Sequence, residues 1–253
     1  MQSNNFTEIT NKNNYKLEIV PPKFKSESKK DRKPPPKPLW DSSENNFVVF
    51  IGRPGSGKTS TALSMITTKN RFYWKKYDKI FIISPSILGN NMERSHPIFS
   101  LPQEQLFNEL TVETIDDILE QIEETDNHCL LLFDDCQTDM AKGGVLKKMK
   151  HLIFNRRHIA GGLTIYITSQ VWNNIPLSLR KACTHMFLYS TKNRTEIESI
   201  YKELINGIIT QEQFDKMLEY VFDEKYQFLF MDIYNQEKKV FYKKFNLLSI
   251  HTE

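Results

Sequence analysis

The sequence predicts an α/β fold in which helices flank a mostly parallel sheet, and three observations point to it. Five short apolar segments have the pattern of buried strands, and helical patterns separate them. A glycine-rich loop joins the first strand directly to the first helix. Strands that alternate with helices require right-handed crossovers, which leave successive strands parallel. The five strand segments are Phe47–Ile51, Lys79–Ser84, Cys129–Asp134, Leu163–Ser169 and His185–Tyr189.

The composition indicates a folded chain in a reducing compartment. Apolar residues make up 39% and charged residues 26% of the 253 residues, which is typical of globular proteins. The three cysteines form no CxxC pair, and their odd number argues against a disulfide framework. No apolar run approaches the roughly 18 residues of a membrane-spanning helix, and the first ten residues lack a signal-peptide core. We therefore expect a protein that is neither secreted nor inserted in a membrane.

Residues 1–46 differ from the rest of the chain and are expected to form a disordered, basic, proline-rich tail. They hold six of the eleven prolines, and seven Lys or Arg residues lie between Lys23 and Lys37. Such a segment has too little apolar surface to offset its ordering entropy, and its prolines favour an extended form. It is either a solvated linker or a basic arm for DNA or another acidic partner.

The core is expected over 47–192 and a C-terminal extension over 193–253. Helical patterns in the core cover Lys58–Thr68, Val112–Glu124 and Val145–His158, with a short turn at Leu177–Lys181. Residues 88–110 are interpreted as an insertion with one short helix. The extension is expected to contain helices Thr195–Ile205 and Thr210–Phe222, then strands Tyr226–Tyr234 and Lys239–Phe245 joined by a turn at Asn235–Lys238.

The loop after the first strand fits the pattern G-x-x-x-x-G-K-[ST] of a phosphate-binding loop (P-loop). Glycines let successive backbone N–H groups turn toward phosphate oxygens, and the next helix presents its N-terminal donors. We expect Lys58 to reach the β- and γ-phosphates and the Thr59 hydroxyl to ligate Mg²⁺. Pro54 contributes no N–H but leaves the other donors in place. The residues expected to bind nucleotide are Gly52, Arg53, Pro54, Gly55, Ser56, Gly57, Lys58, Thr59 and Ser60.

Two acids and an amide follow the third and fourth strands. Asp134 is expected to hold the Mg²⁺ shell and Asp135 to act as general base on the attacking water. Gln170 could hydrogen-bond both the γ-phosphate and that water. Each could instead be an ordinary loop residue, but their occurrence together with the P-loop favours the catalytic interpretation. No N-K-x-D guanine signature is present, so ATP is favoured over GTP.

A basic stretch follows the acids. From Lys142 to His158 there are six Lys or Arg residues, two histidines and no acid. An apolar stripe through the same stretch predicts that the basic residues project from the opposite helix face. That face is either simply solvated or contacts a nucleic-acid backbone without reading bases. The candidate DNA contacts are Lys142, Lys147, Lys148 and Lys150.

Together these motifs resemble the FtsK/HerA superfamily of DNA-pumping ATPases, and within it the poxvirus-type genome-packaging ATPases of large DNA viruses and virophages. The resemblance covers about Phe47 to Tyr189. Besides Gly52–Thr59 and Leu131–Asp135, it rests on Arg157-His158 and on the spacing Gln170-x5-Pro176-x3-Arg180-x3-Thr184-His185. Arg53-Pro54 departs from the small residues that are common in the family's loop.

The resemblance implies a P-loop NTPase with a RecA-like sheet of order 5-1-4-3-2, assembled as a homo-oligomeric ring. It also implies an arginine donated in trans to the site of a neighbouring subunit, which can raise the rate on the order of 10³-fold or more. Arg156, Arg157 and Arg180 are the candidates, with Arg157 slightly favoured.

The expected function is a Mg²⁺-dependent ATPase that pumps double-stranded DNA into a preformed viral capsid. Its partners would be that DNA, a ring of identical subunits and a capsid component, with no membrane. Its expected location is the viral assembly site in the host cytoplasm, or the virion. The alternatives are a cellular translocase or helicase of the same superfamily, and a nucleotide-gated binding or capsid-assembly factor that hydrolyses ATP slowly.

Overall fold

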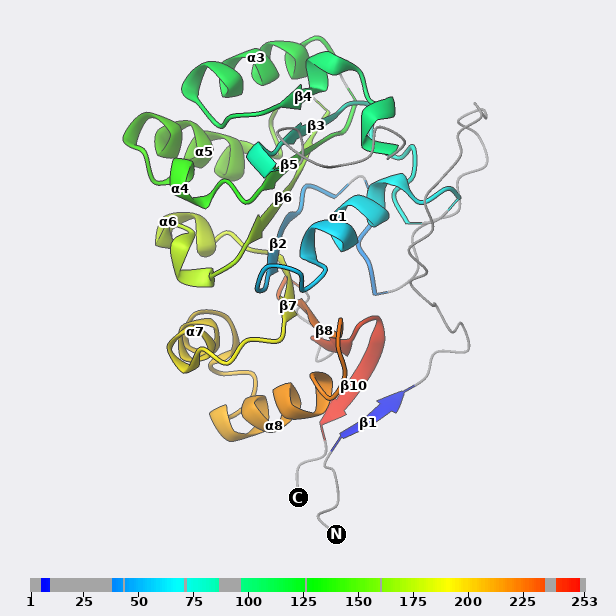
Figure 1. Ribbon diagram of the computed structural model, residues 1–253, viewed down its shortest axis with the longest axis vertical. Helices are drawn as coiled ribbons and strands as arrows, with labels where there is room; N and C mark the ends of the chain where they lie inside the picture. The colour runs from blue at the N-terminus through cyan, green and yellow to red at the C-terminus, as the bar shows by residue number, and fades with distance from the viewer. Residues whose placement is uncertain are drawn as a thin grey trace.

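One continuous sheet carries helices on both of its faces (Figure 1). The fold is that of a computed structural model, which describes residues 6–9 (backbone only), 38–42, 44–70, 72–86, 97–125, 127–159, 161–234 and 240–250. Within these residues the sheet has ten strands. The basic segment Lys23–Lys37 and the predicted turn at Asn235–Lys238 lie outside the described residues.

Five parallel strands form the centre of the sheet in the order β7-β2-β6-β5-β3. They are β2 (Phe47–Ile51), β3 (Ile80–Ile83), β5 (Cys129–Asp134), β6 (Leu163–Ser169) and β7 (His185–Tyr189). The predicted α/β class and the order 5-1-4-3-2 are therefore confirmed for these strands. Their carboxyl ends meet at one edge of the sheet, where α/β proteins bind ligands.

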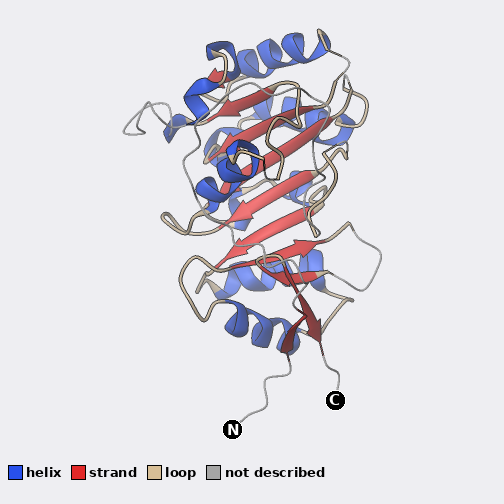
Figure 2. Ribbon diagram, turned by 90° about the vertical axis from the view of Figure 1, so that its right-hand side faces the viewer, coloured by secondary structure: helices blue, strands red, loops and turns tan. Residues whose placement is uncertain are grey.

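The sheet as a whole differs from the prediction because it continues past both sides of this centre. A short parallel strand, β4 (Leu106–Phe107), adds to β3 in the stretch expected to hold only a helix. Beyond β7 the extension adds antiparallel strands to the same sheet, so it is not a separate layer (Figure 2). The strands from the extension are, in order from β7, β8 (Phe228–Asp232), β9 (Phe241–Lys243) and β10 (Asn246–Ile250), and β1 (Phe6–Ile9) from the N-terminal segment follows β10.

The prediction of a disordered tail is wrong at two places within residues 1–46. Phe6–Ile9 pairs as a strand with β10, and Leu39 and Trp40 are buried. The centroid of the Trp40 ring lies 5.2 Å from that of Tyr73 and 4.6 Å from that of His185, so the apolar area of Trp40 is buried among other rings. The division of the chain into tail, core and extension remains a prediction.

The two faces of the sheet have separate apolar cores, because strand side chains alternate. Along β2, Phe47, Val49 and Ile51 face one core, and Val48 and Phe50 face the other. The second face is covered by α1 (Lys58–Thr67), and the first by the remaining α-helices (Figure 1). Those are α3 (Val112–Glu123), α4 (Gln137–Met140), α5 (Gly143–Asn155), α6 (Leu177–Arg180), α7 (Arg194–Ile200) and α8 (Gln211–Val221).

Side-chain caps explain where several helices begin. The Thr111 hydroxyl accepts the backbone N–H of Thr114 at the start of α3, and Thr210 forms a capping box with Gln213 at the start of α8. The helix predicted over 195–205 changes character midway, since α7 continues as the π-helix η4 (Tyr201–Ile205). Short 3₁₀ helices are η1 (Pro97–Ser100), η2 (Gln103–Gln105) and η3 (Trp172–Asn174).

Of the helices in the described segments, none combines the length and apolar character needed to cross a bilayer.

Candidate nucleotide-binding site

The glycine-rich loop between β2 and α1 needs glycine at three of its positions. Gly55 and Gly57 have φ angles of 73° and 100°, in the left-handed region that side chains disfavour. A Cβ on Gly52 would lie 2.6 Å from the Ser56 Oγ and 2.7 Å from the Tyr189 Cβ. The loop therefore has the exposed, tightly turned backbone that wraps a phosphate chain.

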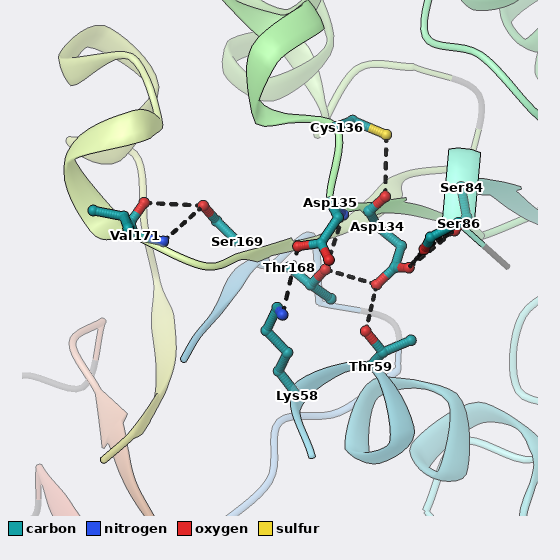
Figure 3. A network of polar contacts seen from close by, with 10 residues as sticks. All are labelled: Lys58, Thr59, Ser84, Ser86, Asp134, Asp135, Cys136, Thr168, Ser169 and Val171. Carbon is teal, nitrogen blue, oxygen red and sulfur yellow. Dashed lines mark hydrogen bonds and ion pairs between the residues drawn. The ribbon is translucent and has the colours of Figure 1, made fainter. Parts of the chain in front are cut away.

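Among the residues predicted to bind nucleotide, some face the two acids at the end of β5 and others lie on the rim of the loop. Lys58 is buried and Thr59 is half-buried, and both point toward β5 (Figure 3). Arg53, Pro54 and Ser60 have exposed side chains. Any contact of the rim residues with nucleotide remains a prediction.

The structure brings the two predicted metal ligands together. The Thr59 hydroxyl donates to the Asp134 Oδ1 at 2.6 Å, and Asp134 is only 1% exposed (Figure 3). A hydroxyl and a carboxylate so close at the mouth of a phosphate loop are the oxygen donors that Mg²⁺ prefers beside phosphate oxygens. These residues could hold the ion.

Three hydroxyl groups that the sequence interpretation missed hold Asp134 in place. Thr168, on β6, donates to Oδ1 at 2.7 Å, and Ser84 donates to Oδ2 at 2.9 Å. Ser86 donates to the same Oδ2 at 3.3 Å. The sequence could have indicated these hydroxyl groups, because they lie at or just past the carboxyl ends of β6 and β3. Those two strands pair with β5, so their ends lie beside Asp134.

Asp135 lies beside Lys58, which it contacts at 3.5 Å between Oδ1 and Nζ. Its φ of 53° is in the left-handed region that aspartate tolerates better than most residues, and its N–H donates to the Thr168 hydroxyl at 3.1 Å. Burial raises the pKa of the Asp135 carboxyl, opposed by the Lys58 charge and reinforced by Asp134. A hydrogen bond from Gln170 also lowers this pKa, so Gln170 reaches the same carboxylate. The predicted base and amide are thus neighbours.

A family comparison agrees with this geometry. Residues 46–232 match the model of the family described as zonular occludens toxin (Zot). The chain belongs to the Zot family. Comparison with curated proteins gives no match.

Solved structures share the fold of this Zot-family chain. The DNA-packaging ATPase B204 of Sulfolobus Turreted Icosahedral Virus is 17% identical, with a TM-score of 0.54 over 77% of this chain and 96% of that one. The genome packaging NTPase B204 of Sulfolobus turreted icosahedral virus 2, in complex with AMP, is 16% identical, with a TM-score of 0.52 over 82% and 98%. The cytoplasmic domain of the type VII secretion ATPase EccC of Thermomonospora curvata is 14% identical, with a TM-score of 0.50 over 85% and 24%. The predicted resemblance to viral genome-packaging ATPases is confirmed at the level of the fold.

The three candidate arginines of the Zot-family chain lie in different surroundings. Arg157 is exposed at the end of α5, where it donates to the Tyr234 hydroxyl at 3.2 Å. Arg180 is 8% exposed and pairs with Glu203 at 3.0 Å and with the Asn173 side chain at 2.6 Å. Arg156 is also buried and donates to backbone carbonyl groups.

These surroundings separate the arginines by accessibility. Arg156 and Arg180 are committed to contacts within their own chain, because withdrawing a buried guanidinium would leave its partners unpaired. Arg157 is the accessible member of the three. The trans role itself stays a prediction.

The basic helix of the Zot-family chain is less basic than its sequence suggested. Lys147 and Lys150 are exposed on α5, as expected. Lys148, however, forms an ion pair with Asp116 of α3, and Lys142 pairs with Asp139 at 2.6 Å. Acids outside the stretch therefore pair with two of the four candidate lysines. Contact of any of the four with DNA remains a prediction.

Proposed function

We propose that the protein hydrolyses ATP with Mg²⁺ and uses the energy to move double-stranded DNA into a preformed viral capsid. One observation carries the proposal: Lys58 and Thr59 of the loop meet Asp134 and Asp135 of the β5 end at a single edge of the sheet. A lysine and a hydroxyl on a phosphate loop, facing two carboxylates, supply the charge stabilisation and the base that triphosphate hydrolysis needs.

The donor set fits a magnesium ion. Thr59 and Asp134 would hold it, and the hydroxyl groups of Thr168 and Ser84 would keep the Asp134 carboxylate in one orientation. When bound, the ion would neutralise charge on the phosphate oxygens.

Asp135 is the proposed general base. Burial raises its pKa, which makes the carboxylate a stronger proton acceptor than an exposed aspartate. Lys58 lies 3.5 Å from this carboxylate and opposes the rise. When Lys58 turns to a phosphate, Asp135 loses that favourable charge and its affinity for a proton increases. Nucleotide binding would in this way activate the base.

The exposed lysines on α5 support the DNA part of the proposal. Lys147 and Lys150 project into solvent from the helix that follows the acids through α4. A shift of this segment with nucleotide state would move two phosphate-binding cations. On this proposal the protein forms a homo-oligomeric ring in which Arg157 serves the neighbouring subunit. It would dock on a capsid component and act at the viral assembly site in the host cytoplasm, or in the virion.

A second candidate is a nucleotide-gated assembly factor with slow hydrolysis. The Lys58–Asp135 ion pair favours it, because a contact that nucleotide binding must break defines two states of the site. A cellular translocase of the same superfamily would share the chemistry of the first proposal.

The test is the ATPase rate as a function of double-stranded DNA concentration at two salt levels. We expect strong stimulation of the wild type and an unchanged basal rate in Lys147→Ala/Lys150→Ala. The double variant should need more DNA to reach half-maximal stimulation. The slope of the logarithm of its DNA affinity against the logarithm of the salt concentration should decrease in magnitude by about two, because two phosphate contacts are lost. Lys148→Ala is the matched control, since Asp116 already neutralises Lys148.

The outcomes separate the candidates. A wild type that hydrolyses ATP without stimulation by DNA would favour the second candidate, the nucleotide-gated assembly factor. A double variant with unchanged DNA affinity would place the DNA contacts outside α5.

A further inference from the structure

Tyr226 lies against the phosphate loop but belongs to the C-terminal extension. A Cβ built on Gly57 would lie 3.9 Å from the Tyr226 Cδ1 and 3.8 Å from the Tyr189 Cε1. Phe228 pairs with Tyr189 across β8 and β7, so the start of β8 lies at the same edge of the sheet as the loop. Tyr226, two residues earlier, therefore borders the loop from the β8 side.

This side is opposite to the catalytic acids. Lys58 and Thr59 point toward the end of β5, which is reached from β2 through β6. The terminal phosphate of a nucleotide in this loop would lie on that side. The nucleoside end of the same molecule must then leave the loop toward β7 and β8, where the ring of Tyr226 is.

The conformation of Tyr226 is unfavourable and its ring is exposed. Its φ is 61°, in the left-handed region where an aromatic residue is a rare outlier, and the residue is 68% exposed. An exposed ring contributes little to the core, and glycine would fit this backbone with less strain. Folding therefore gives no reason for a tyrosine at this position, whereas a ligand for its ring would.

We propose that Tyr226 is a stacking platform for the purine base of the nucleotide. This inference rests on the proposed function in taking the loop as a nucleotide site. The exposed face of a phenol ring stacks on any purine and does not read the edge of the base. The C-terminal extension would thus complete a site whose phosphate-binding part is in the core.

The experiment compares binding of MgATP, MgGTP and magnesium tripolyphosphate by titration calorimetry in wild type, Tyr226→Gly and Tyr226→Phe. Glycine removes the ring and suits the left-handed backbone, so this variant should fold at least as well as wild type, which thermal melting checks. We expect Tyr226→Gly to weaken ATP and GTP alike by roughly tenfold while tripolyphosphate binding is unchanged. Tyr226→Phe should keep wild-type affinities.

Tyr234→Ala is the matched control, because Tyr234 is also an exposed tyrosine, 60% accessible, but contacts Arg157 away from the loop. The proposal is overturned if Tyr226→Gly binds ATP within twofold of wild type, or if wild type binds tripolyphosphate as tightly as ATP. A wild type that binds none of the three ligands would instead overturn the assignment of the loop as a nucleotide site.

Discussion

The two edges of the central sheet both contain buried polar groups, but they use them differently. At the carboxyl edge, hydroxyl groups from α1, from the residue after β3 and from β6 converge on the carboxylate of Asp134. At the amino edge, buried polar side chains bond mostly to backbone: Arg156 to the Asn45 carbonyl, and Thr184 to the backbone of Phe47. His185 is buried there and packs against the rings of Trp40 and Phe230.

This difference suggests separate roles: the carboxyl edge carries the groups that can react, and the amino edge carries groups that stabilise the fold. Carboxylates that are oriented by neighbours and remain next to an open loop can bind a cation or accept a proton. Buried side chains that hydrogen-bond to backbone atoms hold the ends of the strands in place. Their removal is expected to lower the stability of the fold and to leave turnover unchanged. Substitutions at the carboxyl edge should therefore change turnover, and those at the amino edge should change stability.

The largest effect is expected from Asp135→Asn. The amide cannot accept the proton of the attacking water, so kcat should fall by about 10² to 10⁴ while ATP still binds. Single-turnover hydrolysis together with equilibrium ATP binding measures both quantities. Asp232→Asn, at the amino edge, is the control and should retain wild-type kcat. An Asp135→Asn variant with normal turnover would mean that another group activates the water.

A smaller loss is expected from Thr168→Val. This change removes the hydrogen bond to Asp134 and the acceptor of the Asp135 N–H, and loss of such supporting contacts typically costs 10- to 100-fold in activity. We expect the loss in kcat more than in KM, and recovery in Thr168→Ser.

Thr164→Val is a control on the same strand at the opposite edge, where the hydroxyl bonds to the Glu44 carbonyl. Both valine variants should lose stability by about 1 to 3 kcal/mol in urea unfolding, because each leaves polar groups unpaired. Only Thr168→Val should lose turnover. Equal kcat values for the two would remove the functional distinction between the edges.

The smallest effect concerns pH and the amino edge. Burial lowers the pKa of His185 to about 3, although the Asp232 carboxylate lies 3.4 Å from its Nε2. The unfolded chain gains this proton below about pH 6.5, whereas the folded chain does not. Stability should therefore fall as pH decreases from about 6.5 toward 3, by up to ~1.4 kcal/mol per pH unit from this residue.

His185→Phe tests this by removing the titrating group while keeping a ring beside Trp40. Urea unfolding at pH 7.5 and pH 5 should show a weaker pH dependence in the variant than in wild type. An identical dependence in both proteins would mean that His185 is protonated in the folded state or does not titrate on unfolding.

Local patterns in the sequence were enough to predict the central part of the fold. Strand bounds such as Phe47–Ile51 and His185–Tyr189 were predicted to the residue, because an apolar run with turn residues at its ends is a short-range signal. The same holds for the loop between β2 and α1 and for the acid at the end of β5. In each case the residues that determine the structure are neighbours in the chain.

Tertiary structure decided the features whose partners are far apart in sequence. Asp116 neutralises Lys148, Glu203 holds Arg180, and Thr168 orients Asp134 across distances of more than twenty residues along the chain. No local spacing encodes such pairs, since they depend on which strand ends and helix faces the sheet order brings together. The position of Tyr226 beside Gly57 is the same kind of feature: the pairing of β8 with β7 places an extension residue at the loop, and only the folded chain defines that contact.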